Sequence, residues 1–571
     1  MNSSVRHTPE LSRIAALPRR KADGSDLVGP LTELLATPEG LAAGVRLRAA
    51  QALALHDIGV YGGAFCPLGV GEGKTLITLL APYVLDAARP LLLLPANLIE
   101  KTERDRKRLE RLWRIPTNIR LFSYEMLGRV QSAAELEVFK PDVILGDEIH
   151  KLKNRRAAVT RRVGRWMHER PETRFVALSG TVMSRSLTEF AHILRWCLKG
   201  DAPVPRTVEE TEEWAMALDE KVDALRRYEP GALLALASRE DLETLGTPPV
   251  VAARRGFQKR LVETPGVVAT TNDGEHIGAS IYIKAITYRM QAVTSEHLEK
   301  LRREYLTPDD WDVTPVDVWR HARELALGFH GVWDPRPPLE WREARRNWFS
   351  FVREVLSRSR TLDSPEHVAM ACDAGTLPSE ALSAWRAIKD TFIPNAVPRW
   401  HDDSALGVCR EWMGGAGAPR PGIVWVEHVP FGERLSELTG APYFGEGGFD
   451  ASGAFIDDAD PKRPIIASIK ANREGRNLQE KWSRNLVTSP PEGAGVWQQL
   501  IGRTHRPGQI ADEVVFDVFL GCAEHARAMA KALLAATAVR DTTGAPAKLL
   551  VADFDWPSDD AIATYTGPRW A

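Results

Sequence analysis

The stretch GDEIHKLKN (146–154) contains two adjacent carboxylates, Asp147 and Glu148, directly before a histidine and several basic residues. The residues that precede the pair, DVIL (142–145), are typical of a buried strand, so we expect both acids at its C-terminal end. Because neighbouring side chains of an extended chain point to opposite sides, one carboxylate can hold Mg²⁺ while the other faces a water molecule. We assign the metal to Asp147 and the attacking water to Glu148. The alternative is an exposed acidic pair at the end of a strand.

A glycine-rich segment, CPLGVGEGKT (66–75), leads from a strand-like region into a helix-like one. Its glycines let backbone N–H groups converge on phosphate oxygens, and the positive end of the helix dipole adds to the attraction. Lys74 would reach the β- and γ-phosphates, and the Thr75 hydroxyl would ligate Mg²⁺. Leu68 stands where the strict phosphate-loop pattern has its first glycine, and a glycine-rich turn without a ligand is the alternative. The predicted nucleotide-binding residues of this loop are Gly71, Glu72, Gly73, Lys74 and Thr75.

Short apolar runs alternate with amphipathic segments between about residues 31 and 200, and this pattern predicts buried parallel strands joined by helices. The runs are PLLLLPANLI (90–99), DVILGDE (142–148) and RFVALSGT (174–181). After a linker at 414–422, similar runs return at 423–428, 464–469 and 514–520. The sequence therefore predicts an α/β protein with two parallel-sheet units.

The region between the two α/β units is rich in charge and tryptophan, and its pattern predicts helices. A strand-like piece within it, ASIYIKAITY (279–288), could belong to the second sheet. Trp341 and Trp348 lie seven residues apart on one helical face, where we expect a tryptophan-filled core in preference to a groove that stacks bases. The predicted divisions are a flexible segment at 1–30, a first lobe at 31–200, a helical insertion at 201–405, a second lobe at 406–540 and a tail at 541–571.

The composition argues against several classes of protein. Of the 571 residues, 74 are Lys or Arg and 76 are Asp or Glu, so a polyanion would have to be bound by a local patch. The five cysteines contain no CxxC pair, which argues against a zinc module or a disulfide framework and agrees with a reducing, cytoplasmic location. We find neither the apolar core of a signal peptide nor a segment that could span a membrane, so we expect no membrane partner.

Four segments, GVGEGKT, DEIH, LSGT and QLIGRTHRPGQ, occur in the order of the motifs of superfamily 2 helicases. DEIHKLKN and GRTHRPGQ resemble, more narrowly, the DEAHxxKN and GRxHRxGQ signatures of Swi/Snf-type DNA translocases, and the helical insertion is similar to that of phage-encoded members. The resemblance covers about residues 47–200 and 406–525. It implies two RecA-like lobes with ATP and Mg²⁺ in the cleft between them. It also implies ATP-driven movement along duplex DNA in the cytoplasm of a bacterium or a phage-infected host.

The resemblance also assigns roles to residues of the first lobe. LRAAQ (47–51) is similar to the family's LRxxQ opening, which implies that Arg48 and Gln51 contact the adenine. LSGTVMSRSLTEF resembles the motif in which Ser179 and Thr181 would link the state of the nucleotide to movement of the lobes.

In the second lobe, EGRNLQ resembles a family motif that implies a place for Gly475 near the lobe interface. The last motif carries Arg503 and Arg506, which lie three residues apart and so share one face if the segment is helical. A guanidinium stays charged and suits the negative charge that develops on the γ-phosphate, which both arginines can reach only if the lobes close. We predict catalytic roles for both and for Gln499, and the alternative is that the arginines only brace the lobe.

Seven basic residues and no acidic one occur between residues 151 and 165: Lys151, Lys153, Arg155, Arg156, Arg161, Arg162 and Arg165. In a nearly neutral chain such a block is a local footprint for a polyanion, although a solvated basic face is the alternative. The predicted DNA contacts are Lys151, Lys153, Arg155 and Arg156. His150 lies between the acids and the bases and could couple them. The segments LLLLPANLIEK (91–101) and FSYEML (122–127) resemble those that follow a DNA strand in the family.

The motifs are compatible with functions of more than one class. An ATP-driven motor on duplex DNA is favoured by the KN that follows DEIH and by the closing HRPGQ. An RNA or single-strand helicase would be expected to carry a DEAD box, a SAT motif or an RNA-binding module, and the sequence has none of them. A clamp without catalysis is disfavoured because Lys74, Glu148 and Arg506 are all present. The motor subunit of a restriction or defence complex would need a partner that supplies the nuclease.

Overall fold

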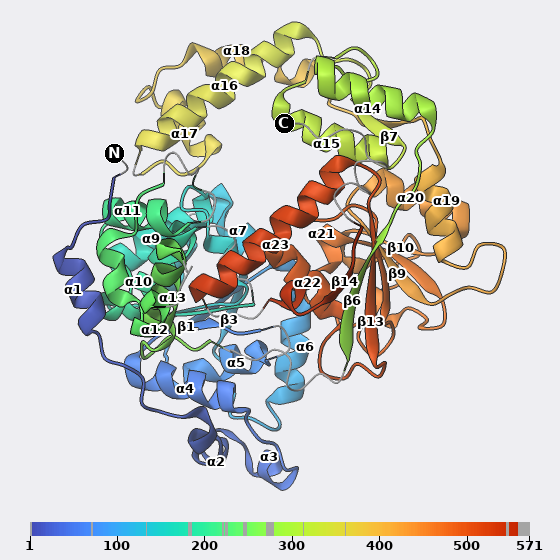
Figure 1. The fold of residues 1–571 in the computed structure, drawn as a ribbon. Helices are drawn as coiled ribbons and strands as arrows, with labels where there is room; N and C mark the ends of the chain where they lie inside the picture. The colour runs from blue at the N-terminus through green and yellow to red at the C-terminus, as the bar shows by residue number, and fades with distance from the viewer. Residues whose placement is uncertain are drawn as a thin grey trace. The chain divides into compact units, whose positions relative to one another are not determined.

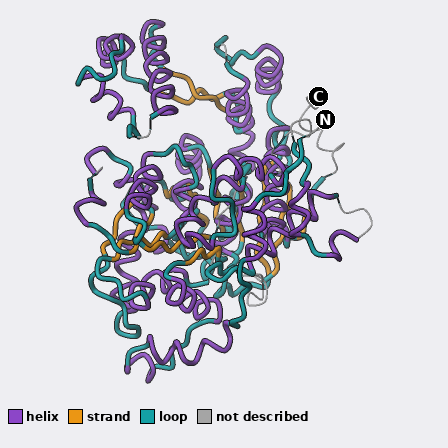
Figure 2. The backbone as a smooth tube through the Cα atoms, turned by 90° about the vertical axis from the view of Figure 1, so that its left-hand side faces the viewer, coloured by secondary structure: helices purple, strands orange, loops and turns teal. Residues whose placement is uncertain are grey.

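The computed structural model describes residues 3–69, 72–132, 134–180, 186–219, 222, 227–243, 248–269, 279–311, 313–359, 361–543 and 547–557. The chain forms two compact units, which are described separately (Figure 1). The first unit consists of Met1–Asp273, Phe349–Ser379 and Leu534–Ala547. The second consists of Gly274–Trp348, Glu380–Leu533 and Lys548–Ala571. Both units contain strands and helices (Figure 2).

The first unit contains a five-stranded parallel sheet with the strand order β1-β5-β4-β2-β3. Its strands are β1 (Ala64–Pro67), β2 (Pro90–Leu94), β3 (Arg120–Ser123), β4 (Val143–Gly146) and β5 (Arg174–Ser179). Side chains alternate between the two faces of a strand, so Leu91 and Leu93 of β2 belong to one hydrophobic core and Leu92 and Leu94 to another. Because both faces are buried, the strands read as continuous apolar runs.

Helices precede, join and follow these strands. They are α4 (Ala49–Tyr61), α5 (Lys74–Val84), α6 (Ile99–Leu109), α7 (Tyr124–Leu127), α8 (Glu135–Phe139), α9 (Ala158–Glu169), α10 (Ala191–Leu198), α11 (Val208–Leu218), α12 (Arg239–Glu243) and α13 (Pro249–Val262). All of them except α12 contribute to the two cores. Trp214 of α11 and Phe257 of α13 pack edge to face in the same core as the odd-numbered leucines of β2. This packing places α11 and α13 in the first unit.

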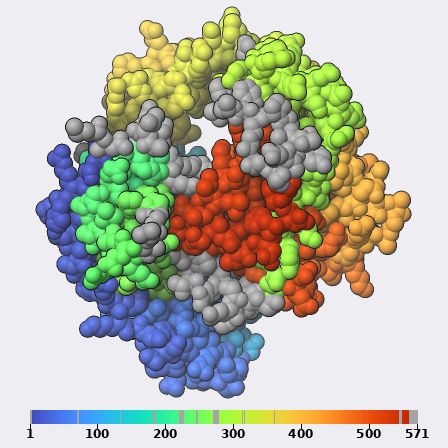
Figure 3. Space-filling model, in the orientation of Figure 1, coloured from blue at the N-terminus to red at the C-terminus, as the bar shows by residue number. Residues whose placement is uncertain are grey.

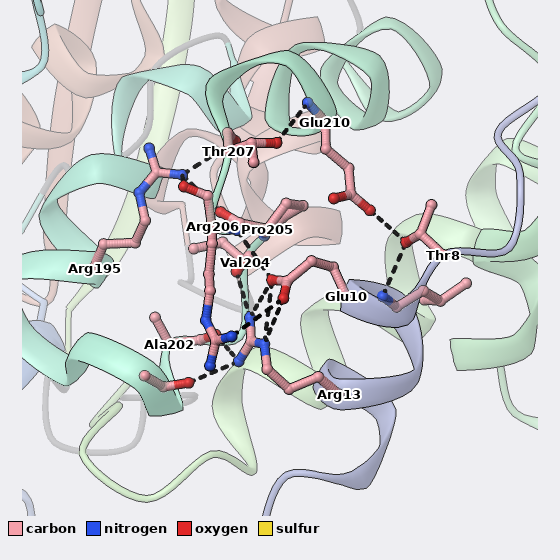
Figure 4. Close-up of polar contacts among 12 residues, drawn as sticks. Thr8, Glu10, Arg13, Arg195, Ala202, Val204, Pro205, Arg206, Thr207 and Glu210 are labelled. Atoms are coloured by element: carbon pink, nitrogen blue, oxygen red, sulfur yellow. Dashed lines mark hydrogen bonds and ion pairs between the residues drawn. The ribbon is translucent and has the colours of Figure 1, made fainter.

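The N-terminal segment also forms helices, α1 (Pro9–Ala16), α2 (Gly24–Leu35) and α3 (Pro38–Ala42). Leu11 and Ile14 lie on one face of α1 and are buried in the first core. Arg13 of the same helix binds Glu10 and donates to the carbonyls of Gly200, Ala202 and Val204 (Figure 4). The blue surface of this segment therefore borders the green surface of the chain beyond residue 200 (Figure 3). Although the composition suggested a flexible segment at 1–30, its apolar spacing supports a docked helix.

The second unit contains a seven-stranded parallel sheet with the order β10-β11-β9-β12-β13-β6-β14. The strands are β6 (Ser280–Ile286), β9 (Gly422–Val426), β10 (Tyr443–Phe444), β11 (Pro464–Ser468), β12 (Arg484–Val487), β13 (Glu513–Phe519) and β14 (Asp553–Asp555). Helices α19 (Ser404–Trp412), α20 (Val429–Thr439), α21 (Ile469–Asn472) and α22 (Ala494–Thr504) accompany them, as does the part of α23 (Ala523–Thr543) that ends at Leu533. Strand β6 pairs with β13 along its whole length, which confirms that the strand-like piece at 279–288 belongs to the second sheet.

The remaining elements come from the tryptophan-rich region. They are α14 (Ala292–Glu304), α15 (Pro315–Ala326), β7 (Phe329–Trp333), α16 (Leu339–Arg358), α17 (Pro365–Asp373), α18 (Glu380–Ile388) and β8 (Ala396–Trp400), with β7 and β8 antiparallel. Trp341 and Trp348 are buried, with 3% and 4% of their surfaces exposed. Trp341 packs against Trp333, Trp385 and Phe392. This burial confirms a tryptophan core.

The predicted fold class is confirmed, because the chain is a mixed α/β protein with two parallel sheets and additional helices. The divisions inferred from composition at about residues 30, 200, 405 and 540 remain predictions. Among the described residues, no helix combines the length and the apolar character that crossing a membrane requires.

Candidate functional site

The candidate site lies at the carboxyl edge of the first sheet, where parallel strands end side by side. Strand β1 leads into the glycine-rich loop, β4 leads into Asp147 and Glu148, and β5 ends at Ser179. Strand β5 lies between β1 and β4 and pairs with both. The sheet therefore brings the three motifs together although they are far apart in the sequence.

Lys74 is the first residue of α5 and lies beside the glycine-rich loop. Its ammonium group donates to the carbonyl oxygens of Leu68 at 3.1 Å and of Gly69 at 2.8 Å. Glu72, Gly73 and Thr75, like Lys74, are half-buried, while Gly71 lies outside the described residues. The described part of the loop thus folds around the lysine at the N-terminus of a helix, as an anion site requires.

Gln51 of α4 lies against this loop. Its side-chain oxygen accepts from the backbone N–H of Arg48 at 2.9 Å, and its amide nitrogen is 3.4 Å from the Gly73 carbonyl. Gly73 has a left-handed backbone with φ of 72°, and a Cβ added there would lie 2.2 Å from that amide nitrogen. Glycine is therefore required both for the turn and for the approach of Gln51. The predicted adenine residue and the phosphate loop are adjacent in space.

Asp147 is buried, with 9% of its surface exposed. Burial, and after it the neighbouring charge of Glu148, raises the pKa of the Asp147 carboxyl to about 6, although Lys74 and the Glu148 N–H act in the opposite direction. A nearby cation would favour the ionised carboxylate. The positive charge of Lys74 already acts on this group, which connects the loop to the acid pair electrostatically.

The donor atoms present here fit Mg²⁺. A hard cation prefers oxygen ligands, and Asp147 and the Thr75 hydroxyl provide them. Among the residues that the structure describes, no group of three or more His, Cys, Asp or Glu side chains is arranged to hold a metal ion.

Glu148 forms a small polar cluster with His150 and Ser179. Its carboxylate is 3.4 Å from the Ser179 hydroxyl and 3.3 Å from His150 Nδ1. The Ser179 hydroxyl and His150 Nδ1 are 3.2 Å apart. The side chains of Glu148 and His150 are only 17% and 14% exposed. A carboxylate oriented in this way can accept a proton from water. The predicted coupling residues His150 and Ser179 therefore contact the predicted base, whereas Thr181 lies outside the described residues.

The motif of the second unit is arranged around the loop that contains Gly475, whose φ is 73°. Arg503, on α22, is 5% exposed, and it donates to the carbonyls of Gln499 and Arg476, both at 2.9 Å. Gln499 donates to Glu474 at 3.3 Å. These contacts support a bracing role for Arg503 and Gln499 within the second unit.

Arg506 differs from Arg503 because α22 ends at Thr504. The two arginines therefore do not share a helical face, as a continuous helix would have required. Arg506 is half-buried and donates to the side-chain oxygen of Asn477 at 2.8 Å. Of the two, it remains the candidate for contact with a phosphate.

The basic run divides into two parts. Arg162 and Arg165 both bind Asp363, at 3.0 and 2.8 Å, and Arg161 donates to the carbonyls of Leu356 and Leu362. These three arginines bind the part of the predicted insertion that belongs to the first unit. The predicted DNA contacts are therefore limited to the basic residues at the beginning of the run. Lys151 is half-buried, and Lys153, Arg155 and Arg156 are exposed.

Tyr124 also belongs to the site, although its sequence context did not predict this. Its hydroxyl donates to the backbone carbonyl of Asp147 at 2.8 Å, in the interior of the first unit. The only signal in the sequence was its place in FSYEML, which suggested a DNA-following segment and no link to the acids.

Comparison of the chain with models of known protein families found no match, and comparison with curated proteins found none either.

Proposed function

We propose that the protein is an ATPase that couples hydrolysis to movement along duplex DNA. The observation that carries the proposal is the meeting of Lys74, Asp147 and Glu148 at one edge of a parallel sheet. A lysine at a glycine-rich helix start, a buried carboxylate and a second, more exposed carboxylate are the three groups that hydrolysis of a nucleoside triphosphate requires.

In the proposed mechanism, Lys74 and the backbone N–H groups of the loop bind the phosphates, and Gln51 contacts the base. Thr75 and Asp147 would hold Mg²⁺, which neutralises charge on the phosphates when bound. Glu148 orients the attacking water and takes its proton. Arg506 stabilises charge on the γ-phosphate, as an arginine finger does.

DNA is proposed as the partner because the exposed basic residues of the 151–156 segment follow the acid pair directly. Arginine and lysine beside a nucleotide site can neutralise phosphates of a polynucleotide without reading its sequence. A single-strand or RNA helicase, or the motor subunit of a restriction complex, would use the same site.

The test is ATP hydrolysis with Mg²⁺, measured in parallel with duplex DNA, single-stranded DNA, RNA and no polynucleotide. We expect the strongest stimulation by duplex DNA, and Lys74→Ala should abolish it by weakening nucleotide binding. Stronger stimulation by RNA or by single-stranded DNA would favour the alternative helicases. Absence of hydrolysis under all four conditions would contradict the proposal.

A further inference from the structure

The turn that carries the acid pair has a backbone that needs external support. Glu148 lies in the left-handed region, with φ of 52° and ψ of 50°, which is unfavourable for any residue that has a Cβ. Two bonds are local: the Glu148 N–H donates to the Asp147 carboxylate at 3.0 Å, and the Lys151 N–H to the Glu148 carbonyl at 3.1 Å. Two others come from neighbouring elements: the Asp147 N–H donates to the Leu93 carbonyl of β2 at 2.9 Å, and the Asp147 carbonyl accepts from a side chain.

That side chain is Tyr124, the first residue of α7. Its hydroxyl lies 2.8 Å from the Asp147 carbonyl oxygen, and only 3% of the residue is exposed. A Cβ added at Gly146 would meet this hydroxyl at 3.1 Å and an Ile149 methyl at 2.4 Å, so a glycine is needed for the turn to pack so closely. Burial, followed by the charges of Asp147, Glu148 and Glu125, raises the pKa of the Tyr124 hydroxyl well above its ordinary value, so it remains a donor.

Helix α7 is bonded to the ends of three neighbouring strands. It follows β3 directly, and its next residue, Glu125, accepts from the backbone N–H of Ala96, just beyond β2, at 3.0 Å. Tyr124 connects it to the end of β4. The ends of β2, β3 and β4 therefore meet at α7, so the turn of the acid pair is bonded to an element that two other strands also hold.

We propose that Tyr124 is a positioning residue that holds the Asp147–Glu148 turn in its hydrolytic geometry. This inference rests on the proposed function and adds a residue that orients the acid pair. Tyr124 acts through the backbone of Asp147 and, being buried, touches neither the nucleotide nor the polynucleotide.

The test compares Tyr124→Phe with Tyr288→Phe. Tyr288 is a matched control because it is also a buried tyrosine whose hydroxyl donates to a backbone carbonyl, that of Ala326, in the second unit. Both variants lose one buried hydroxyl and keep the ring, so we expect similar small decreases in Tm. If the loss of a buried hydrogen bond had only a general effect, kcat would fall equally in the two variants.

For Tyr124→Phe we expect a decrease of about tenfold in DNA-stimulated kcat, with KM for ATP and the DNA concentration for half-maximal stimulation nearly unchanged. The gain in affinity for a fluorescent ATP analogue on addition of Mg²⁺ should fall by about tenfold as well, since Asp147 lies on the same turn. Tyr288→Phe should change neither quantity.

Wild-type kcat and a wild-type Mg²⁺ effect in Tyr124→Phe would overturn the inference, as would equal losses of kcat in the two variants. In either case hydrolysis by the unmodified protein would still support the proposed function. If the unmodified protein itself did not hydrolyse ATP, the proposed function would fail and this inference with it.

Discussion

Glu148 combines an unfavourable backbone conformation with a carboxylate that contacts both His150 and Ser179. If it deprotonates the attacking water, Glu148→Gln should lower kcat by about 10² to 10⁴, because an amide cannot accept the proton. Nucleotide affinity should change little, since the phosphates are bound elsewhere. Steady-state hydrolysis and titration with a fluorescent ATP analogue measure the two effects. Glu212→Gln, which changes an exposed acid on α11, is the control, and near-wild-type turnover in Glu148→Gln would rule out this base.

Asp147 should make the free energy of unfolding fall as the pH rises, whereas most acids of folded proteins make it rise. Its folded pKa of about 6 lies above the value of about 4 expected in the unfolded chain, so the folded protein binds more protons between these values. Its contribution to stability is therefore full below about pH 4 and is lost as the pH rises through about 6. Without Mg²⁺ or nucleotide, Asp147→Asn should equal the wild type near pH 4 and exceed it by about 1 to 3 kcal/mol at pH 7.

Urea unfolding at the two pH values measures this difference, and a variant that is less stable than the wild type at pH 7 would contradict the raised pKa. Addition of Mg²⁺ with nucleotide should reverse the order at pH 7. Ligand bound to the folded state alone stabilises it, and the Asn variant lacks the carboxylate that would hold the metal.

At the scale of elements, the end of α22 separates the roles of two arginines. Arg503 lies in the last helical turn and is bonded to two carbonyls, while Arg506 lies beyond the helix and is less buried. Arg506→Ala should therefore lower DNA-stimulated kcat by about 10³ or more with little change in Tm. Arg503→Ala should lower Tm, because it removes one buried donor from each of two carbonyl groups.

Thermal unfolding and hydrolysis assays of both variants decide between the roles. If Arg506→Ala lost Tm in proportion to its activity, the bracing role would apply to it too. The ion pairs of Asp363 illustrate such bracing in the first unit, where Arg162 and Arg165 of α9 bind a residue from the insertion.

Charge at the scale of the whole molecule does not attract a polyanion, since the formal net charge is −2. Binding of DNA would depend on a few local phosphate contacts, each of which releases counterions. Replacing Lys151 and Lys153 with Gln should therefore reduce the slope of log K against log salt by about one to two. Fluorescence anisotropy with a duplex at several salt concentrations measures the slope. A control that replaces Lys21 and Lys462, exposed lysines in the two units, should leave it unchanged.

The sequence alone indicated the longer buried strands of both sheets and the turn of the glycine-rich loop, whereas the strands β3, β10, β12 and β14 were not predicted. Continuous apolar runs reflect strands buried on both faces, and the spacing of Gly73, Lys74 and Thr75 is a local property of a loop before a helix. The adjacency of Asp147 and Glu148 at a strand end was visible for the same reason. Even β6, inside a helical region, could be recognised from its own apolar pattern.

Only the tertiary structure decided which partners these residues have. Arg162 and Asp363 are 201 residues apart, and the basic run that contains Arg162 looked equally suited to DNA. The bond from Tyr124 to the Asp147 carbonyl likewise depends on the order of β2, β3 and β4 in the sheet. Backbone propensity and side-chain periodicity act over a few residues, whereas such contacts form only when the chain packs and each buried polar group must find a partner.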